Sequence, residues 1–283
     1  MESLLKPYLA RRSRGIKQPV MDFLFTYYRF RPSQLMRWQP GFGVALQGPQ
    51  ADAFLASPHY GRTSKGITLL PERFPVHRIR SLQWVRHLLA TTAARPPFYG
   101  CAGMHEWAMV YRTKNLRHER PLRLPPRVIA QVVETYPIRC SHYDAFRFFT
   151  PEARPLNQLQ PERHRIPDFE QPACLHANMD LYRWAYTFYP WIGSDFIADA
   201  FELACRIREV DMRASPYDLQ DEGYPPICVE TAEGRKLYQM YQQQFYESAQ
   251  ILRKRLLAMF DHLLEHLPRE TLATTSPDKD SRD

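Results

Sequence analysis

The chain lacks long apolar runs and paired cysteines. No apolar stretch reaches the ~18 residues that a membrane-spanning helix requires, and the N-terminus has no apolar secretory segment, so we expect no membrane association. The five cysteines are dispersed, and neither a Cys-x-x-Cys pair nor a zinc-finger spacing occurs among them. This pattern favours reduced thiols in a cytoplasmic protein.

Several familiar functional motifs are missing as well. The sequence has no Walker P-loop, no Gly-x-Gly-x-x-Gly after a strand, no Gly-x-Ser-x-Gly and no EF-hand loop. His105 and Glu106 do not begin a His-Glu-x-x-His motif, because Met109 stands where the second histidine belongs. These absences exclude the common patterns of nucleotide-binding proteins, serine hydrolases, calcium-binding loops and zinc proteases.

The charge is shifted toward basic residues. The net charge is +8 and the isoelectric point is near 9.3. Such an excess favours association with a polyanion, so we expect DNA or another polyanionic substrate as the partner. Arginines interleaved with aromatic residues near the N-terminus leave open a non-catalytic nucleic-acid binder.

Helical periodicity dominates the rest of the pattern. Apolar residues recur at helical spacing over residues 81–94 and over a long final helix that Thr231 caps. Short strands are expected only near 44–46 and 67–69, and an exposed loop at 159–172. We predict a mainly α fold with a few short strands: one domain over residues 1–270, then a disordered tail over 271–283.

Two adjacent helices carry most of the polar residues of interest. On the first, His176, Asp180 and Arg183 follow at i, i+4 and i+7 and share one stripe beside an apolar one. Ser194 is expected to cap the second helix, which carries Asp211 in or just after its last turn. The stripe also fits a plain surface ion pair with a core histidine.

Two other segments add histidines and acids. His105 and Glu106 follow glycines that let the backbone approach a neighbouring element, and His142 and Asp144 lie in a dense aromatic stretch. We expect these segments to meet the two helices in one aromatic-walled cavity. Such a constellation indicates an enzyme.

Four segments carry a family resemblance: HEWAMVYR, IRCSHYDAFRFFTPEARPLN, CLHANMDLYRWAY and REVDMRASPYDL. They resemble a bacterial family that usually carries the label 3-methyladenine DNA glycosylase, over roughly residues 19–256. The resemblance implies a DNA-repair N-glycosidase, a hydrolase that removes an alkylated purine without a cofactor.

The chemistry of that reaction assigns provisional roles. A flipped cationic purine needs an aromatic pocket, and one carboxylate can stabilise the oxocarbenium-like sugar or orient the water. The candidate catalytic residues are Asp180, Asp211, His176 and Glu106, and the candidate substrate-binding residues are Trp107, Tyr143, Tyr182, Trp184, Arg183 and Arg213.

A metal centre is the alternative. His105, His142 and His176, with Asp144 or another of the acids, offer enough donors for iron or zinc within a helical protein. The protein would then be a metal-dependent oxygenase or hydrolase acting on a small anionic substrate. The spacing of the residues does not decide between the two hypotheses.

Overall fold

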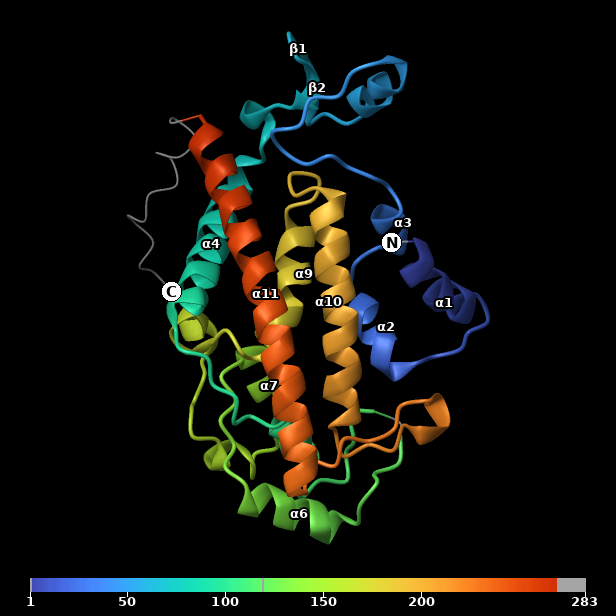
Figure 1. Cartoon of the computed structure of the whole chain (residues 1–283), viewed down its shortest axis with the longest axis vertical. Helices are drawn as coiled ribbons and strands as arrows, with labels where there is room; N and C mark the ends of the chain where they lie inside the picture. The colour runs from blue at the N-terminus through green and yellow to red at the C-terminus, as the bar shows by residue number, and fades with distance from the viewer. Residues whose placement is uncertain (1, 119, 269–283) are drawn as a thin grey trace.

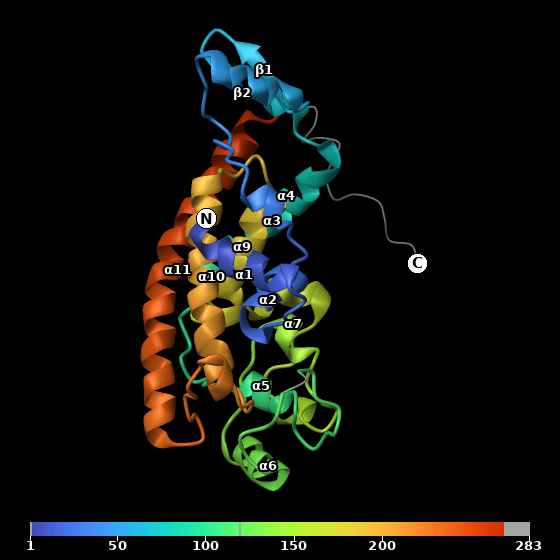
Figure 2. The same ribbon diagram turned by 90° about the vertical axis from the view of Figure 1, so that its right-hand side faces the viewer.

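Long helices form the centre of the protein. The computed structural model describes residues 2–118 and 120–268. Helices α9 (Leu175–Thr187) and α10 (Ser194–Arg213) pack against each other and against α11 (Ala232–His266), which also contacts α4 (Ile79–Ala94). Figures 1 and 2 show that α11 covers one face of the α9–α10 pair, whereas α2 (Pro19–Thr26) and α7 (Tyr143–Phe146) lie on the other.

The apolar stripes of the central helices explain this packing. On α10, Ile197, Ala200, Phe201, Ala204 and Ile207 are buried at the spacing of one helical face. Burial of each large side chain of this kind stabilises the fold by about 1.5–3 kcal/mol. The stripe therefore fixes the rotation of α10 about its axis, and with it the direction of Asp211.

Helix α11 holds the first turns of α9 in place. Its N-terminus is capped by Thr231, whose hydroxyl accepts a hydrogen bond from the Gly234 amide at 3.0 Å. Farther along, the Gln242 amide donates to the Ala173 carbonyl at 2.8 Å, and Arg253 donates to Asn178 at 2.5 Å. These buried contacts position the part of α9 that carries the polar stripe.

Shorter elements complete the fold. The remaining α-helices are α1 (Glu2–Ser13), α3 (Pro32–Leu35), α5 (Met104–Ala108), α6 (Pro126–Thr135) and α8 (Ile166–Phe169). Turns of 3-10 helix span Pro49–Ala56, Pro71–Arg73, Val76–Arg78, Arg154–Leu156, Arg163–Arg165 and Gln220–Glu222. The prediction of a mainly α fold with few strands is confirmed. Among the described residues, no helix is long and apolar enough to cross a membrane.

The short sheet differs from its prediction in one strand. It pairs β1 (Tyr60–Thr63) with β2 (Gly66–Leu69) in antiparallel register, Tyr60 opposite Leu69. The expected strand at 44–46 is wrong, because only Leu46 forms an isolated bridge, to Ile67. Pairing β1 with β2 closes only a short turn between neighbouring segments, at a small entropic cost.

Two further expectations about local structure are corrected. Segment 159–172 includes helix α8, and its end is buried, with Glu170 only 4% exposed. Gly193 occupies the N-cap position of α10, while the Ser194 hydroxyl accepts a hydrogen bond from the Gln39 amide at 2.9 Å. The tail predicted over 271–283 lies outside the described residues.

Candidate metal centre

His105 is held by a close contact between α5 and the end of α10. Gly103, before α5, has a φ of +68°, and a Cβ there would lie 3.3 Å from both Ala214 and the Tyr238 ring. The indole of Trp107 donates to the Ala214 carbonyl at 2.9 Å. The glycine thus lets α5 approach α10 closely, as the small residues in this segment predict.

Asp211 points to the same place from the last turn of α10. Its side chain is fully buried, and its Oδ2 accepts a hydrogen bond from the buried Arg208 at 3.1 Å. Arg208 also lies 3.7 Å from the Glu106 carboxylate. A buried acid near a helix C-terminus is costly, and Arg208 offsets much of that cost.

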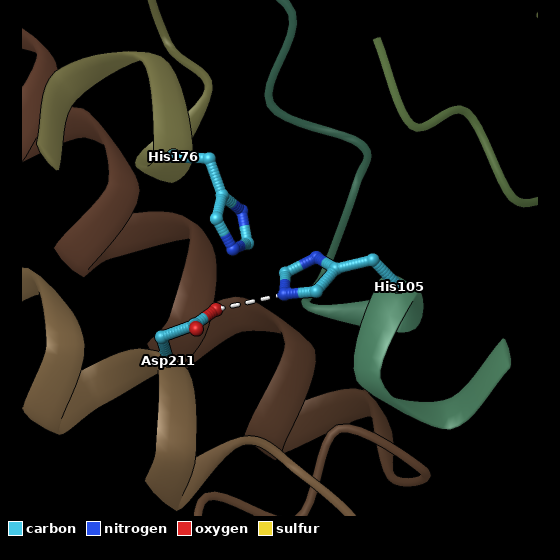
Figure 3. A group of neighbouring side chains, drawn as sticks. All are labelled: His105, His176 and Asp211. Atoms are coloured by element: carbon cyan, nitrogen blue, oxygen red, sulfur yellow. Dashed lines mark ion pairs between the residues drawn. The ribbon is translucent and has the colours of Figure 1, made fainter. Parts of the chain in front are cut away.

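The two residues meet His176 to form the inner group, which we define as His105, His176 and Asp211. The ligand atoms of the three side chains all lie within 4.8 Å of one another. The His105 and His176 rings are edge to face, with centroids 4.5 Å apart. Figure 3 shows the two rings and the carboxylate turned toward one another, each arriving from a different helix.

The closest contact in the inner group has the separation of two metal ligands. His105 Nε2 lies 2.9 Å from Asp211 Oδ1, within ion-pair distance, and no third described residue forms a hydrogen bond with either atom. Two neighbouring ligands about 2.1 Å from an octahedral iron ion are roughly 3 Å apart, and around a tetrahedral zinc ion they are roughly 3.4 Å apart. Buried polar atoms are almost always paired, and either a proton on His105 or a cation shared by the two side chains would compensate Asp211 at this distance.

The electrostatics of the inner group set the charge of each residue. Burial alone would lower the pKa of His105, but Asp211 raises it well above the ordinary value. Burial alone would raise the pKa of Asp211, and His105 lowers it well below the ordinary value. For His176, burial and the neighbouring His105 both lower the pKa. An ionised Asp211 and a neutral His176 are the forms in which these residues bind metals, and His105 would have to release its proton when a metal binds.

A second set of donors, the cleft group, consists of His142, Glu170 and Asp180. All three are buried, and their ligand atoms also lie within 4.8 Å of one another. His142 Nε2 is 3.3 Å from Asp180 Oδ2 and 3.4 Å from Glu170 Oε1. Tyr28 donates to Asp180 Oδ1 at 2.8 Å, and Arg183 to Oδ2 at 3.4 Å.

Charges within the cleft group are unevenly compensated. Burial would raise the pKa of Asp180, but Arg183 and His142 lower it to about 2. Burial raises the pKa of Glu170 to about 7, with His142 acting in the opposite sense. For His142, the lowering by burial is outweighed by Asp180, so its pKa is raised. Glu170 is therefore the least compensated of the three.

The cleft group forms the floor of a wide opening. The cleft has a volume of about 1200 Å³ and is lined by the cleft group and by the cations Arg80, Arg147, Arg163 and Arg183. Trp84 and Trp184 form an aromatic wall, with ring centroids 5.7 Å apart. A ligand with negative charge and flat apolar surface fits such a lining.

A small cavity connects the two groups. It has a volume of about 30 Å³ and is lined by His142 and Asp180 from the cleft group, by His176 from the inner group, and by Glu106 and Arg208. This volume is enough for one or two water molecules. The His142 and His176 rings stack beside it with centroids 5.2 Å apart.

The predicted substrate-binding residues are split by the fold. Tyr143, Arg183 and Trp184 line the cleft. Trp107 and Tyr182 are fully buried, and neither lines it. Arg213 pairs with Glu209 at 3.2 Å, also away from the cleft.

The acids are distributed differently from the expectation. Glu106, Asp180 and Asp211 all lie at the inner group, the cleft group or the cavity between them. Asp144, expected among the metal ligands, belongs to neither group, because Arg147 and Arg183 hold its carboxylate at 2.9 and 3.0 Å. Glu170 takes its place. The only signal for Glu170 was its position just before the helix that carries His176.

Fold and site together define a helical protein with a buried histidine–carboxylate centre beside an arginine-lined cleft. Comparisons of the chain with family models, with curated proteins and with solved structures give no match.

Proposed function

We propose that the protein is a metal-dependent enzyme, an oxygenase or a hydrolase, whose inner group binds one iron or zinc ion. The observation that carries the proposal is the convergence of His105, His176 and Asp211 on one buried point, where their ligand atoms lie within 4.8 Å of one another. Two histidines and one carboxylate are the ligand set of non-haem iron oxygenases and of many zinc hydrolases.

The surroundings of the inner group also suit a metal site. Arg208 hydrogen-bonds the carboxylate oxygen of Asp211 that does not face His105. Partners of this kind orient the ligand and tune its basicity. A bound ion would polarise a substrate oxygen or lower the pKa of a bound water.

The substrate class follows from the cleft. Among the described residues, Arg80 and Arg163 make no side-chain hydrogen bond or ion pair, so both are available to an anion. The aromatic wall favours a substrate that also carries a flat apolar part. We therefore assign a small anionic substrate to this enzyme, in a cytoplasmic location that agrees with five free cysteines.

Elemental analysis tests the proposal. The full chain, purified without a chelator, is expected to contain at least one iron or zinc ion per chain, and His105→Ala should lose that ion. His87→Ala, an exposed histidine on α4, is the matched control and should retain it. A protein without metal, or an unchanged metal content in His105→Ala, would contradict the proposal.

An N-glycosidase remains the second candidate. One observation favours it: Asp180 lines the same cleft as Tyr143, Trp184 and Arg183, so a carboxylate, an aromatic wall and a cation are adjacent. A flipped alkylated purine requires these elements. Incubation of the chelated protein with alkylated DNA should release free base if this candidate is right. Release that needs the metal, or no release, would exclude it.

A further inference from the structure

The geometry points to a second metal ion, held by His142, Glu170 and Asp180, beside the ion of the inner group. The centre would then be dinuclear, and its outer ion would face the cleft. This inference deepens the proposed function and rests on it.

The first argument is the burial of the cleft group. Glu170 is 4% exposed, and among the described residues His142, at 3.4 Å, is the one ion-pair partner of its carboxylate. A buried carboxylate with so little compensation is costly unless a cation binds it. His142 Nε2 lies nearly equidistant from Glu170 and Asp180. Ligands of one tetrahedral ion are separated by roughly 3.4 Å, close to both distances.

The second argument is the support behind these ligands. Tyr28 donates to the Asp180 oxygen that does not face His142. Arg183 bridges Asp180 and Asp144 from the rim of the cleft. The same arrangement occurs at the inner group, where Arg208 holds Asp211. Each group thus has a carboxylate fixed by an arginine three residues away.

The third argument is the spacing between the groups. His176 of the inner group and Asp180 of the cleft group are one turn apart on α9, which corresponds to a rise of about 6 Å. The stacked His142 and His176 rings border the small cavity that both groups share. Two-metal centres have ions about 3.5–4 Å apart with a bridging oxygen between them, so the cavity lies where such a bridge belongs.

The two sites also differ in their access to the cleft, so the two ions would have different roles. His142, Glu170 and Asp180 all line the cleft, whereas His105 and Asp211 do not. A substrate in the cleft would reach the outer ion directly. The inner ion would act through the shared cavity.

Metal stoichiometry tests the inference. The full-length protein is stripped with a chelator, titrated with Zn²⁺ by equilibrium dialysis, and analysed for zinc. We expect two ions per chain for the wild type and one for Glu170→Gln. Glu162→Gln, an exposed acid of the same segment that pairs with His164, is the matched control and should retain two. Circular dichroism confirms that each variant is folded.

The result also separates this inference from the proposed function. One ion in the wild type, lost in His105→Ala and kept in Glu170→Gln, would overturn the second site and leave the proposed function standing. No ion at all would overturn both. Two ions in both the wild type and Glu170→Gln would place the second ion elsewhere, for instance at the exposed His262, Glu265 and His266, and would overturn the inference.

The closeness of the two ions can be tested independently of their number. With Mn²⁺ in place of Zn²⁺, adjacent ions couple magnetically. The wild type should give a coupled electron paramagnetic resonance spectrum, and Glu170→Gln an isolated six-line signal. An isolated signal from a wild type that binds two Mn²⁺ ions would show that they are not neighbours.

Discussion

The inner group and the cleft group use the same kinds of side chain in different surroundings. The inner group has two histidines and one acid, and Asp211 is sealed from solvent. The cleft group has one histidine and two acids, and it forms the floor of an arginine-lined opening. The chemical role of such a cluster therefore depends on its access to solvent and on how its charges are paired, as well as on which residues form it.

The largest expected effect comes from removing the carboxylate of the inner group. Asp211→Asn replaces a buried anionic ligand with a neutral amide of the same shape, so we expect Zn²⁺ affinity at this group to fall at least about 100-fold. Competition with a chelating dye measures it. Asp199→Asn, an exposed acid on the same helix that pairs with Arg255, should change nothing. Equal losses in the two variants would mean that α10 as a whole is disturbed.

Arg208 contacts Asp211 of the inner group and, among the described residues, no residue of the cleft group, so its substitution tests whether the two groups bind metal independently. Arg208→Met should weaken Zn²⁺ binding there by about 10–100-fold and leave the cleft group unchanged. In the metal-free protein it removes the cation beside the buried Glu106 and leaves Asp211 with His105 alone, at a cost of about 3–5 kcal/mol of unfolding free energy. Urea unfolding with and without Zn²⁺ measures both effects. Arg206→Met, on the exposed side of α10, is the control. Weakening at both groups alike would break the distinction between them.

The cleft arginines should have a smaller effect, confined to anion binding. Arg80→Ala and Arg163→Ala each remove one exposed cation, and exposed charge pairs contribute about 0.2–1 kcal/mol, so phosphate affinity should fall about 1.5- to 5-fold. The change in tryptophan fluorescence when inorganic phosphate binds provides the measurement, since Trp84 and Trp184 line the cleft. Arg62→Ala, beside the hairpin turn, should bind phosphate as the wild type does. No change in either cleft variant would argue against an anionic substrate.

The smallest expected effect concerns the pair of Arg123 and Glu230, which lies outside both groups and serves as a reference for the pH dependence of stability. Arg123 binds Glu230 through two contacts of 2.9 and 3.0 Å. Burial would raise the pKa of Glu230, but these hydrogen bonds lower it below its ordinary value. Because the folded pKa is the lower one, the pair stabilises the protein fully above the unfolded value of about 4.3, and this stability is lost as the pH falls through the folded pKa.

Glu230→Gln should therefore lose about 1 kcal/mol or less near neutral pH. The difference from the wild type should shrink as the pH drops below about 4. Urea unfolding of the chelated proteins across this range is the measurement. A difference in unfolding free energy that does not change with pH would contradict this prediction. If metal is released at a pH above this range, the release reflects protonation of the inner group and the cleft group and not unfolding of the rest of the protein.

Much of the fold could be predicted from the sequence. The apolar stripes of α4, α10 and α11 and the Thr231 cap are local patterns, and the structure contains them. Less of the site could be predicted. The sequence analysis expected one cavity, whereas the donors form two groups; Glu170 was assigned to an exposed loop and Asp144 to the metal ligands. Both errors concern residues whose position depends on how a non-helical segment packs.

Local sequence patterns specify the long helices, the buried face of each, and the donor atoms that the chain carries. These properties follow from spacing along the chain, because a helix places residues three and four apart on one face. The division of the donors into two groups, one of which opens to a cleft, depends on how the helices and loops pack. Contacts between distant segments depend on the packing of helices and the course of loops, which no local spacing specifies.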